Sequence, residues 1–241
     1  MHPDDHLLTY PRTRAWFSRR GPVRANVSLM IVEPDAIHMK HVRLASVLSW
    51  RYHLILTRSP DLLGALPNAR KFVFGWSMIA DPDTVDTRKT RACSLIASPK
   101  RDQPGHRLRH RIVERARAEA MDLDIMGRAY RPFGAKEEGL APYRFSVIIE
   151  NVREPSYISE KLLDSLICRT VPIYWGAPDA DRYFDTSGMI LCKDEAEIMT
   201  ALRDLSEARY SALSGPMEAN RATALELART EERAARRLLE G

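Results

Sequence analysis

Short apolar runs alternate with helical patterns along almost the whole chain of 241 residues, and this alternation limits the folds that it can adopt. Apolar runs of about four to eight residues are typical of buried strands, whereas the segments between them have the spacing of amphipathic helices. Strands that alternate with helices usually pair in parallel, because each helix packs back on the sheet. The sequence therefore predicts an α/β fold with mostly parallel strands at residues 27–32, 52–57, 71–76, 92–98, 123–127, 143–150, 171–176 and 189–192.

A polar stretch at residues 80–90, ADPDTVDTRKT, interrupts the alternation and is interpreted as a linker. We expect two facing Rossmann-like domains, at residues 1–88 and 89–241, the first of them reduced to about three strands. Residues 229–241, RTEERAARRLLEG, have the pattern of an amphipathic helix. We expect this helix to pack on the protein, with contact to a membrane or partner surface as the alternative.

The chain carries a formal net charge of +5, which favours an anionic partner such as a nucleotide, a phosphate, a nucleic acid or an anionic membrane surface. Charge alone does not choose among them. The sequence contains no apolar run of about 18 residues and no apolar signal-peptide core near its N-terminus. The spacing of Cys93, Cys168 and Cys192 suits neither zinc nor a disulfide framework, so we expect reduced packing residues in a cytoplasmic protein.

A polar cluster precedes the apolar helical run SEKLLDSLIC at residues 159–168. Ser159 is a good N-cap, and the free backbone N–H groups of the first turn suit a phosphate. Lys161 adds a mobile positive charge, Glu160 can accept from two ribose hydroxyls, and Asn151 follows the end of an apolar strand, where α/β proteins bind ligands. In the alternative interpretation, Ser159 is only a cap and Lys161 only a solvated surface residue.

The segment YRFSVIIENVREPSYISEKLLDSLICRTVPIYWGAP, residues 143–178, resembles the signature of the family-10 glycosyltransferases, the α1,3/1,4-fucosyltransferases. That signature has a Tyr-Lys-Phe, a Phe-Glu-Asn, a Tyr-(Ile/Val)-Thr-Glu-Lys and an apolar strand that ends near Trp-Gly. Ser159 here replaces the usual threonine. The resemblance implies a GT-B fold, with residues 1–88 on the acceptor side and residues 89–241 binding the nucleotide sugar. It implies donor binding by Asn151, Tyr157, Glu160 and Lys161, with Glu160 at the ribose and Lys161 at the diphosphate.

The densest basic run, LIASPKRDQPGHRLRHRIVERA at residues 95–116, also leads from a strand through a loop into a helix. The family resemblance implies an arginine at this place that binds the donor phosphates, and Arg109 is the best match by position, with Arg107 second. A guanidinium suits phosphate because it donates two parallel hydrogen bonds. A solvated helix face and a nucleic-acid-binding helix are the alternatives. The basic run lacks interleaved aromatic residues, so we expect no nucleic-acid partner.

Two Asp-X-Asp motifs, Asp81 to Asp83 and Asp122 to Asp124, match the pattern by which another glycosyltransferase class binds a divalent metal. That pattern normally follows a strand, whereas Asp122 precedes one and the other motif lies in the expected linker. We therefore expect no metal site and no required cofactor, with Arg109 and Lys161 neutralising the departing diphosphate.

Sugar transfer with inversion requires a base for the acceptor hydroxyl. The family resemblance implies that this base is a glutamate at the end of a strand in the N-terminal domain. In this sequence Glu33 directly follows the first clear strand. The family's Gly-Glu-Asn segment is missing, so a purely structural role for Glu33 stays open. His38, His41 and Asp35 are the neighbouring alternatives.

Taken with the resemblance, these residues predict an inverting glycosyltransferase of the hexosyltransferase class that moves fucose from GDP-fucose to a glycan hydroxyl. The expected acceptor is a surface polysaccharide or lipopolysaccharide precursor, and the expected location is cytoplasmic, with peripheral contact to the inner membrane left open. Two other interpretations are a transferase for another nucleotide sugar and a non-catalytic protein that binds nucleotides or glycans.

Overall fold

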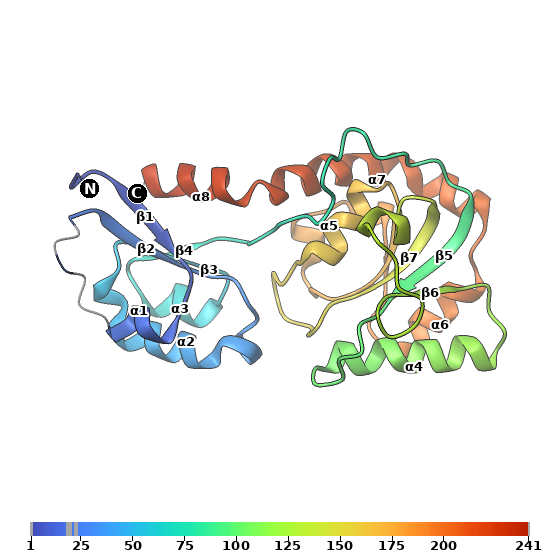
Figure 1. The fold of residues 1–241 in the computed structure, drawn as a ribbon, viewed down its shortest axis with the longest axis horizontal. Coiled ribbons are helices and arrows are strands. Elements are labelled where there is room, and N and C mark those ends of the chain that lie inside the picture. The colour runs from blue at the N-terminus through green and yellow to red at the C-terminus, as the bar shows by residue number, and fades with distance from the viewer. Residues whose placement is uncertain (1, 18–20, 22–23, 241) are drawn as a thin grey trace. The chain divides into compact units, whose positions relative to one another are not determined.

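The structure is a computed structural model, and it describes residues 2–17, 21 and 24–240. The chain forms two compact units (Figure 1). The first unit contains residues 1–74 and 230–241, and the second contains residues 75–229. The division therefore lies between Phe74 and Gly75 rather than between residues 88 and 89, and the end of the chain belongs to the first unit.

The first unit is built on a parallel sheet with strand order β1-β2-β3-β4. Its elements are β1 (His6–Thr9), α1 (Thr13–Phe17), β2 (Asn26–Ile31), α2 (Asp35–Leu48), the 3₁₀ turn η1 (Ser49–Arg51), β3 (Ile55–Thr57), α3 (Pro60–Ala65), β4 (Ala69–Lys71) and α8 (Thr230–Leu239). The sheet has four strands where about three were expected. The additional strand, β1, was missed because its four residues are only partly buried and make no distinct apolar run.

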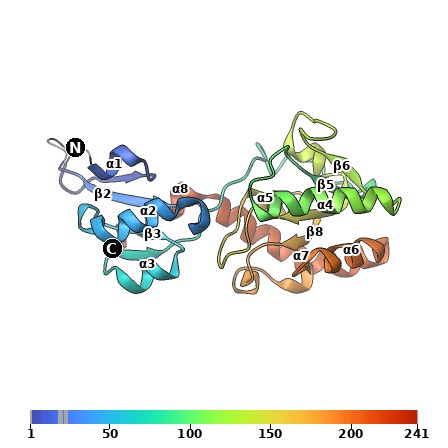
Figure 2. The same cartoon turned by 90° about the horizontal axis from the view of Figure 1, so that it is seen from below.

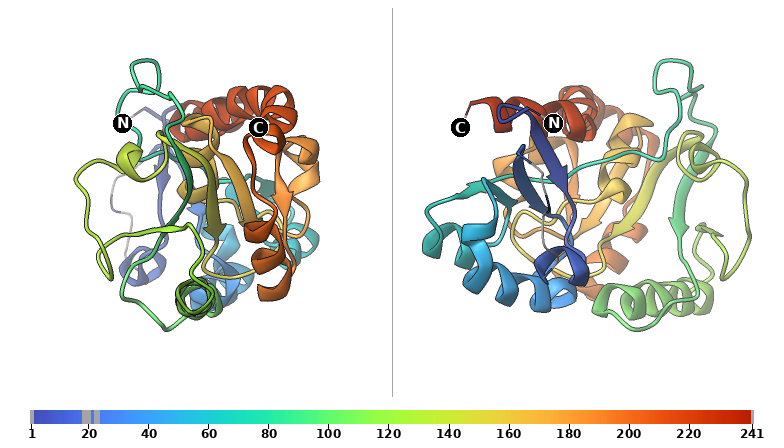
Figure 3. Two further views of the ribbon diagram at one scale, coloured as in Figure 1. Left: turned by 90° about the vertical axis from the view of Figure 1, so that its right-hand side faces the viewer. Right: turned by 60° about the vertical axis from the view of Figure 1, so that its left-hand side comes forward.

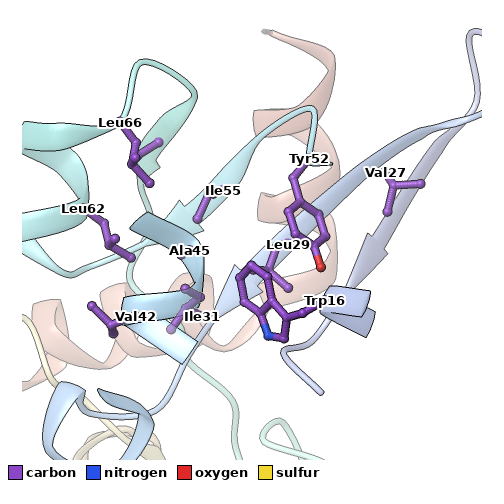
Figure 4. Close-up of a cluster of buried hydrophobic side chains, with 11 residues drawn as sticks. Trp16, Val27, Leu29, Ile31, Val42, Ala45, Tyr52, Ile55, Leu62 and Leu66 are labelled. Atoms are coloured by element: carbon purple, nitrogen blue, oxygen red, sulfur yellow. The ribbon is translucent and has the colours of Figure 1, made fainter. Parts of the chain in front are cut away.

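Apolar side chains cover both faces of this sheet. On one face Trp16, Leu29, Val42 and Ile55 belong to a buried cluster between the strands and α1, α2 and α3 (Figure 4). On the other face Ala234 and Leu238 of α8 pack against buried residues in the strands or directly next to them, which are Met30, Leu54, Leu56 and Phe72. Figure 3 shows α8 on one face of this sheet and α1, α2 and α3 on the other. The prediction that the last helix packs on the protein is thus confirmed.

The second unit contains a five-stranded parallel sheet with strand order β6-β5-β7-β8-β9. Its strands are β5 (Arg91–Ile96), β6 (Asp124–Met126), β7 (Tyr143–Ile149), β8 (Val171–Trp175) and β9 (Ile190–Leu191). Its helices are α4 (Pro104–Ala118), α5 (Glu160–Ile167), α6 (Glu195–Arg203) and α7 (Glu207–Ala228), with the 3₁₀ turns η2 (Lys136–Gly139), η3 (Ala180–Arg182) and η4 (Thr186–Gly188).

Helices cover both faces of the second sheet. α4 and α6 lie side by side on one face (Figure 2), and α5 packs with α7 on the other. A strand buried on both faces reads as a continuous apolar run, which is why β7 and β8 could be predicted closely. Two parallel sheets with flanking helices confirm the predicted α/β class.

Cys93, Cys168 and Cys192 are buried free thiols in the second unit, as expected of packing residues. Among the residues that the structure describes, no helix is long and apolar enough to cross a membrane.

The segment before β5 is bound to the second unit, and this explains why the division lies before the polar stretch. The Asp164 side chain on α5 is fully buried, and its Oδ1 accepts hydrogen bonds from Ser77 Oγ at 2.7 Å and from the Met78 backbone N–H at 3.0 Å. The Lys89 amine donates to the carbonyl oxygens of Ala141 at 2.8 Å and of Cys168 at 2.7 Å. Polar composition alone does not show these contacts, so the boundary at residue 88 was placed too late.

Asp164 should make the stability of the second unit depend on pH. Burial raises the pKa of Asp164 to about 6, against the opposing effect of the hydrogen bond from Ser77. A raised carboxyl pKa stabilises the folded state below the unfolded value of 3.8, and this stabilisation is lost as the pH rises through about 6. The free energy of unfolding of the wild type minus that of Asp164→Asn should therefore fall by up to roughly 3 kcal/mol over this range, because one pKa unit corresponds to about 1.4 kcal/mol. Urea unfolding at several pH values measures it, and a difference that does not change with pH would contradict the assignment.

Candidate active site

The second unit contains a cavity of about 320 Å³. It lies where the carboxyl ends of β5 and β7 meet the first turns of α4 and α5, as ligand sites do in parallel α/β sheets. The residues that line it are Ile96, Ser98, Lys100, His106, Arg109, Lys136, Leu140, Val147, Ile148, Ile149, Asn151, Glu160 and Lys161. Arg109, Asn151, Glu160 and Lys161 were all predicted as donor-binding residues, and the structure brings these four together.

Arg109 on α4 is 5% exposed and is fixed to the end of β7. Its Nε donates to the carbonyl oxygen of Ile149 at 3.0 Å, and its Nη2 donates to the same carbonyl and to Asn151 Oδ1 at 3.1 Å. Within the described part of the chain, Nη1 has no hydrogen-bond partner, so it remains available to a ligand. Burial lowers the pKa of Arg109, and the nearby carboxyl groups of Glu150 and Glu160 oppose this effect. An arginine stays protonated in proteins, so a fixed positive charge faces the cavity.

The first turn of α5 is held by the buried carboxyl group of Glu150. Ser159 donates to Glu150 twice, from its backbone N–H to Oε1 at 2.9 Å and from its hydroxyl to Oε2 at 2.5 Å. The Ser159 hydroxyl also accepts from the Lys161 backbone N–H at 3.3 Å and so caps the helix as predicted. The Lys161 amine lies 3.2 Å from this hydroxyl and 2.8 Å from Glu160 Oε1. Lys161 is thereby held beside the helix N-terminus.

The two glutamates of this site have opposite pKa shifts. Burial raises the pKa of Glu150, although Lys161 and the hydrogen bonds from Ser159 oppose the shift. Burial also acts to raise the pKa of Glu160, but the Lys161 amine, its hydrogen bond and the Lys136 charge outweigh it and lower the pKa. Glu160 is therefore an ionised hydrogen-bond acceptor at the cavity, whereas Glu150 supports the helix from behind.

The first turn of α4 approaches the chain after β7 more closely than any side chain would permit. The Gly105 backbone N–H donates to the carbonyl oxygen of Asn151 at 2.9 Å. A Cβ atom at position 105 would lie 1.7 Å from the carbonyl oxygen of Glu150. The glycine after Pro104 thus allows the N-terminus of α4 to reach the cavity.

Two lysines of the cavity were not predicted. Lys100 is exposed and lies in the loop between β5 and α4. Lys136 is half-buried at the start of η2, and its side-chain amine forms no hydrogen bond or ion pair with any described residue. Burial lowers the pKa of Lys136, and the charges of Asp164 and Glu160 oppose the shift. Lys100 could have been found from its place after a strand end, but no sequence pattern indicates that Lys136 joins it.

Other predicted residues lie elsewhere. Tyr157 is buried and is not one of the described residues that line the cavity. Arg107 is exposed and donates to the backbone carbonyls of Arg101 and Asp102, so Arg109 rather than Arg107 faces the cavity.

Glu33 belongs to the first unit, where it follows β2 and is half-buried. Its assignment as a base stays a prediction. Of its neighbours, His41 accepts a hydrogen bond from Trp16 Nε1 at 2.9 Å, and Asp35 accepts one from Ser59 Oγ at 2.8 Å. Both contacts hold the fold of the first unit.

The acidic motifs form local contacts. Asp124 pairs with Arg91 at 2.8 Å and with Arg131 at 3.4 Å, and it accepts from the Tyr143 hydroxyl. Asp81 accepts from the backbone N–H of Asp83 in a turn. Over the described ranges, no three His, Cys, Asp or Glu residues are grouped so that they could hold a metal ion.

The cavity therefore combines four cationic side chains, two helix N-termini and an ionised carboxylate. The cations are Lys100, Arg109, Lys136 and Lys161. Such a site can bind a phosphorylated ligand and can accept hydrogen bonds from its hydroxyl groups.

Comparison with known proteins agrees with this chemistry. The model of glycosyltransferase family 10 (fucosyltransferase), C-terminal part, matches residues 86–208, which are 123 of the 241 residues. The chain is 34% identical over 59 residues to the alpha-(1,3)-fucosyltransferase FucT of Helicobacter pylori, a match that covers 24% of this chain and 12% of that protein. It is 32% identical over 99 residues to alpha-(1,3)-fucosyltransferase B of Drosophila melanogaster, a match that covers 41% of this chain and 21% of that protein. Both matches span much less than two thirds of these relatives.

The fold is similar to that of an alpha1,3-fucosyltransferase crystallised with GDP-fucose, with a TM-score of 0.58 and 14% identity. This likeness covers 95% of the chain and 80% of that structure. At this identity it shows the fold alone, and it confirms a GT-B-like α/β architecture with Rossmann-like units. Together with the family match, which includes α4, α5 and the whole cavity, it confirms the predicted family. The chain belongs to glycosyltransferase family 10, the fucosyltransferase family.

Proposed function

We propose that the protein transfers fucose from GDP-fucose to a hydroxyl group of a glycan, with inversion at the anomeric carbon. The observation that carries this proposal is the convergence of Arg109 and Lys161, with the first turns of α4 and α5, on one cavity. A nucleoside diphosphate is the group that such a set of donors fits. The choice of GDP and fucose rests on family membership and on relatives described as fucosyltransferases.

The donor-binding residues contact different parts of the leaving nucleotide. The Lys161 amine and the positive end of the α5 helix dipole bind the diphosphate, and Arg109 donates to it through Nη1. Glu160 accepts hydrogen bonds from the ribose hydroxyls, for which its lowered pKa is suited. Asn151 fixes the Arg109 guanidinium through its Oδ1. Tyr157 is buried and does not line the cavity among the described residues, so its donor-binding role stays a prediction.

The reaction is a single displacement. The acceptor oxygen attacks the anomeric carbon, its bond to that carbon forms, and the bond from the carbon to the β-phosphate oxygen breaks. The proton of the acceptor hydroxyl passes to Glu33, and the electron pair of the broken bond leaves on GDP. Because negative charge develops on the diphosphate, Arg109 and Lys161 bind the transition state more strongly than the intact donor.

The acceptor that we propose is a precursor of a surface polysaccharide or lipopolysaccharide, modified in the cytoplasm. We further propose that protein cations neutralise the leaving group, so that GDP binding needs no added divalent metal. Titration with GDP in the presence of EDTA tests this part, and a requirement for Mg²⁺ or Mn²⁺ would refute it.

Replacing the two cations should weaken GDP binding. We expect Lys161→Ala and Arg109→Lys each to raise the Kd for GDP by about tenfold or more, because each variant loses charge-assisted hydrogen bonds. Isothermal titration calorimetry measures the change, and circular dichroism checks the fold. Arg107→Ala, on the exposed side of the same helix, and Lys193→Ala are the matched controls and should bind GDP as the wild type does. If both site variants keep the wild-type Kd, the cavity is not the diphosphate site.

Adding one methyl group at position 105 should displace the N-terminus of α4. Gly105→Ala places a Cβ against the Glu150 carbonyl, so we expect a loss of several kcal/mol of stability or a marked loss of GDP affinity. Gly64→Ala on α3 is the control, since a Cβ there meets nothing within 4 Å. It should stabilise the protein by up to about 1 kcal/mol, as alanine does in a helix. Thermal unfolding with and without GDP measures both variants, and a Gly105→Ala protein with unchanged stability and affinity argues against this packing.

The choice of donor and of base is tested by turnover. Calorimetry with GDP, UDP, ADP and their sugars should show the tightest binding for GDP and GDP-fucose. Glu33→Gln should bind GDP normally but lose about 100-fold or more of the transfer or hydrolysis of GDP-fucose, because general-base catalysis contributes about this much. Tightest binding to UDP would favour a different sugar donor. Turnover by Glu33→Gln at the wild-type rate would remove Glu33 from the mechanism.

A further inference from the structure

The outer side of α2 in the first unit carries large apolar side chains that face solvent. Met39 is 43% exposed, Val47 is 72% exposed, and Trp50 in the following turn η1 is 75% exposed. Arg43 lies between Met39 and Val47, one helical turn from each, and is also exposed. The opposite side of α2 is buried in the core through Val42 and Ala45. The helix is therefore apolar on both sides, although only one side is needed for the core.

Within α1, α2 and η1, cations rather than acids accompany these apolar residues. Lys40 and Arg43 are exposed on the same side of α2. In η1 the guanidinium carbon Cζ of Arg51 lies 5.5 Å from the centroid of the Trp50 ring. The acid of α2 is Asp35, at the first residue of the helix, where it accepts a hydrogen bond from Ser59. Neither α1 nor η1 contains an acid. The surface formed by Met39, Lys40, Arg43, Val47 and Trp50, here called the α2 face, is thus both apolar and positively charged.

The neighbouring helix α1 extends this character. Phe17 at its end is 65% exposed and Arg14 is exposed. α1 is joined to α2 by a hydrogen bond from the Lys40 amine to Thr13 Oγ1 at 3.1 Å. The two helices therefore present aromatic, aliphatic and basic side chains from connected elements.

The sequence of α8 left contact with a membrane or partner surface open, but the apolar side of this helix packs on the protein. Ala234 and Leu238 of α8 are buried against the sheet of the first unit. Its charged residues pair along the helix, as Arg236 does with Glu232. The apolar side of α8 is therefore buried against the sheet, whereas the apolar residues of the α2 face are exposed to solvent.

We propose that the α2 face docks on the surface of an anionic lipid bilayer. Trp50 and Val47 enter the interface between headgroups and acyl chains, where tryptophan is favoured, and Lys40 and Arg43 pair with acidic headgroups. Each cation near such a surface strengthens binding, and insertion of apolar side chains adds to it. A nucleic acid would use the cations but not Val47 and Met39, and a second copy of this face would bring like charges together.

The topology of the first unit supports this orientation. In a parallel α/β sheet a crossover helix runs back against the strands, so the end of α2 lies at the amino ends of β2 and β3. Trp50 therefore lies at this edge of the sheet, and Glu33 at the carboxyl end of β2. The residues that insert most deeply, Val47 and Trp50, therefore lie at the opposite end of α2 from Glu33.

Vesicle flotation tests the proposal on the full chain. Wild type should float with phosphatidylcholine vesicles that contain about one third phosphatidylglycerol and should not float with phosphatidylcholine alone. Val47→Ser combined with Trp50→Ser, and separately Lys40→Glu combined with Arg43→Glu, should each weaken partition by at least about tenfold. Leu239→Ser is the matched control, because Leu239 is 77% exposed on α8 and its replacement should leave partition unchanged.

Further measurements separate the outcomes. All variants should bind GDP with the wild-type Kd, since the replaced residues lie outside the cavity. They should also melt close to the wild type because the residues are exposed, with a decrease of at most a few degrees where Lys40→Glu removes the hydrogen bond to Thr13. The proposal is overturned if wild type does not float with the acidic vesicles, if the α2-face variants float equally well, or if Leu239→Ser abolishes flotation. It is also overturned if light scattering shows a dimer that Val47→Ser with Trp50→Ser converts to a monomer, because the face would then join two copies.

Discussion

The buried carboxyl group of Glu150 joins the end of β7 to the start of α5. It is fully inaccessible and accepts two hydrogen bonds from Ser159, so the strand end and the helix N-terminus cannot move independently. Arg109 binds the same strand end from the other side of the sheet, through the Ile149 carbonyl. Two helix N-termini and two fixed cations are thereby brought to one place. A carboxyl group buried in this way is costly unless it is fully paired, and the Ser159 donors with Lys161 nearby meet that condition.

The second unit could be read from the sequence further than the first. Long apolar runs such as β7 are buried on both faces, and the polar cluster around Ser159 has cap chemistry that local sequence specifies. The family resemblance favoured Arg109 rather than Arg107 as the cavity arginine. In the structure Arg109 donates to the end of β7, whereas Arg107 donates to the Arg101 carbonyl. Local pattern therefore identified the polar cluster at the start of α5, whereas the family resemblance supplied Arg109.

The rest depends on contacts between segments that are distant in sequence. Lys136 reaches the cavity because the loop after β6 folds back over the sheet, and no periodicity encodes this path. The boundary between the units was misplaced because the hydrogen bonds from Ser77 and Met78 to Asp164 join positions that are more than 80 residues apart. β1 is too short and too exposed to make a pattern, and it becomes a strand only by pairing with β2.

The position of α8 has a consequence for synthesis. Residues 1–74 leave the ribosome long before residues 230–239 exist, and until then Met30, Leu54, Leu56 and Phe72 lack the helix that covers them. One apolar face of the sheet in the nascent first unit is therefore uncovered while all of the second unit is being translated. Exposed apolar sheets of this kind are prone to aggregate. The sheet of the first unit is therefore closed by a helix that is made only after the whole second unit, and chaperone binding during translation would act on that interval.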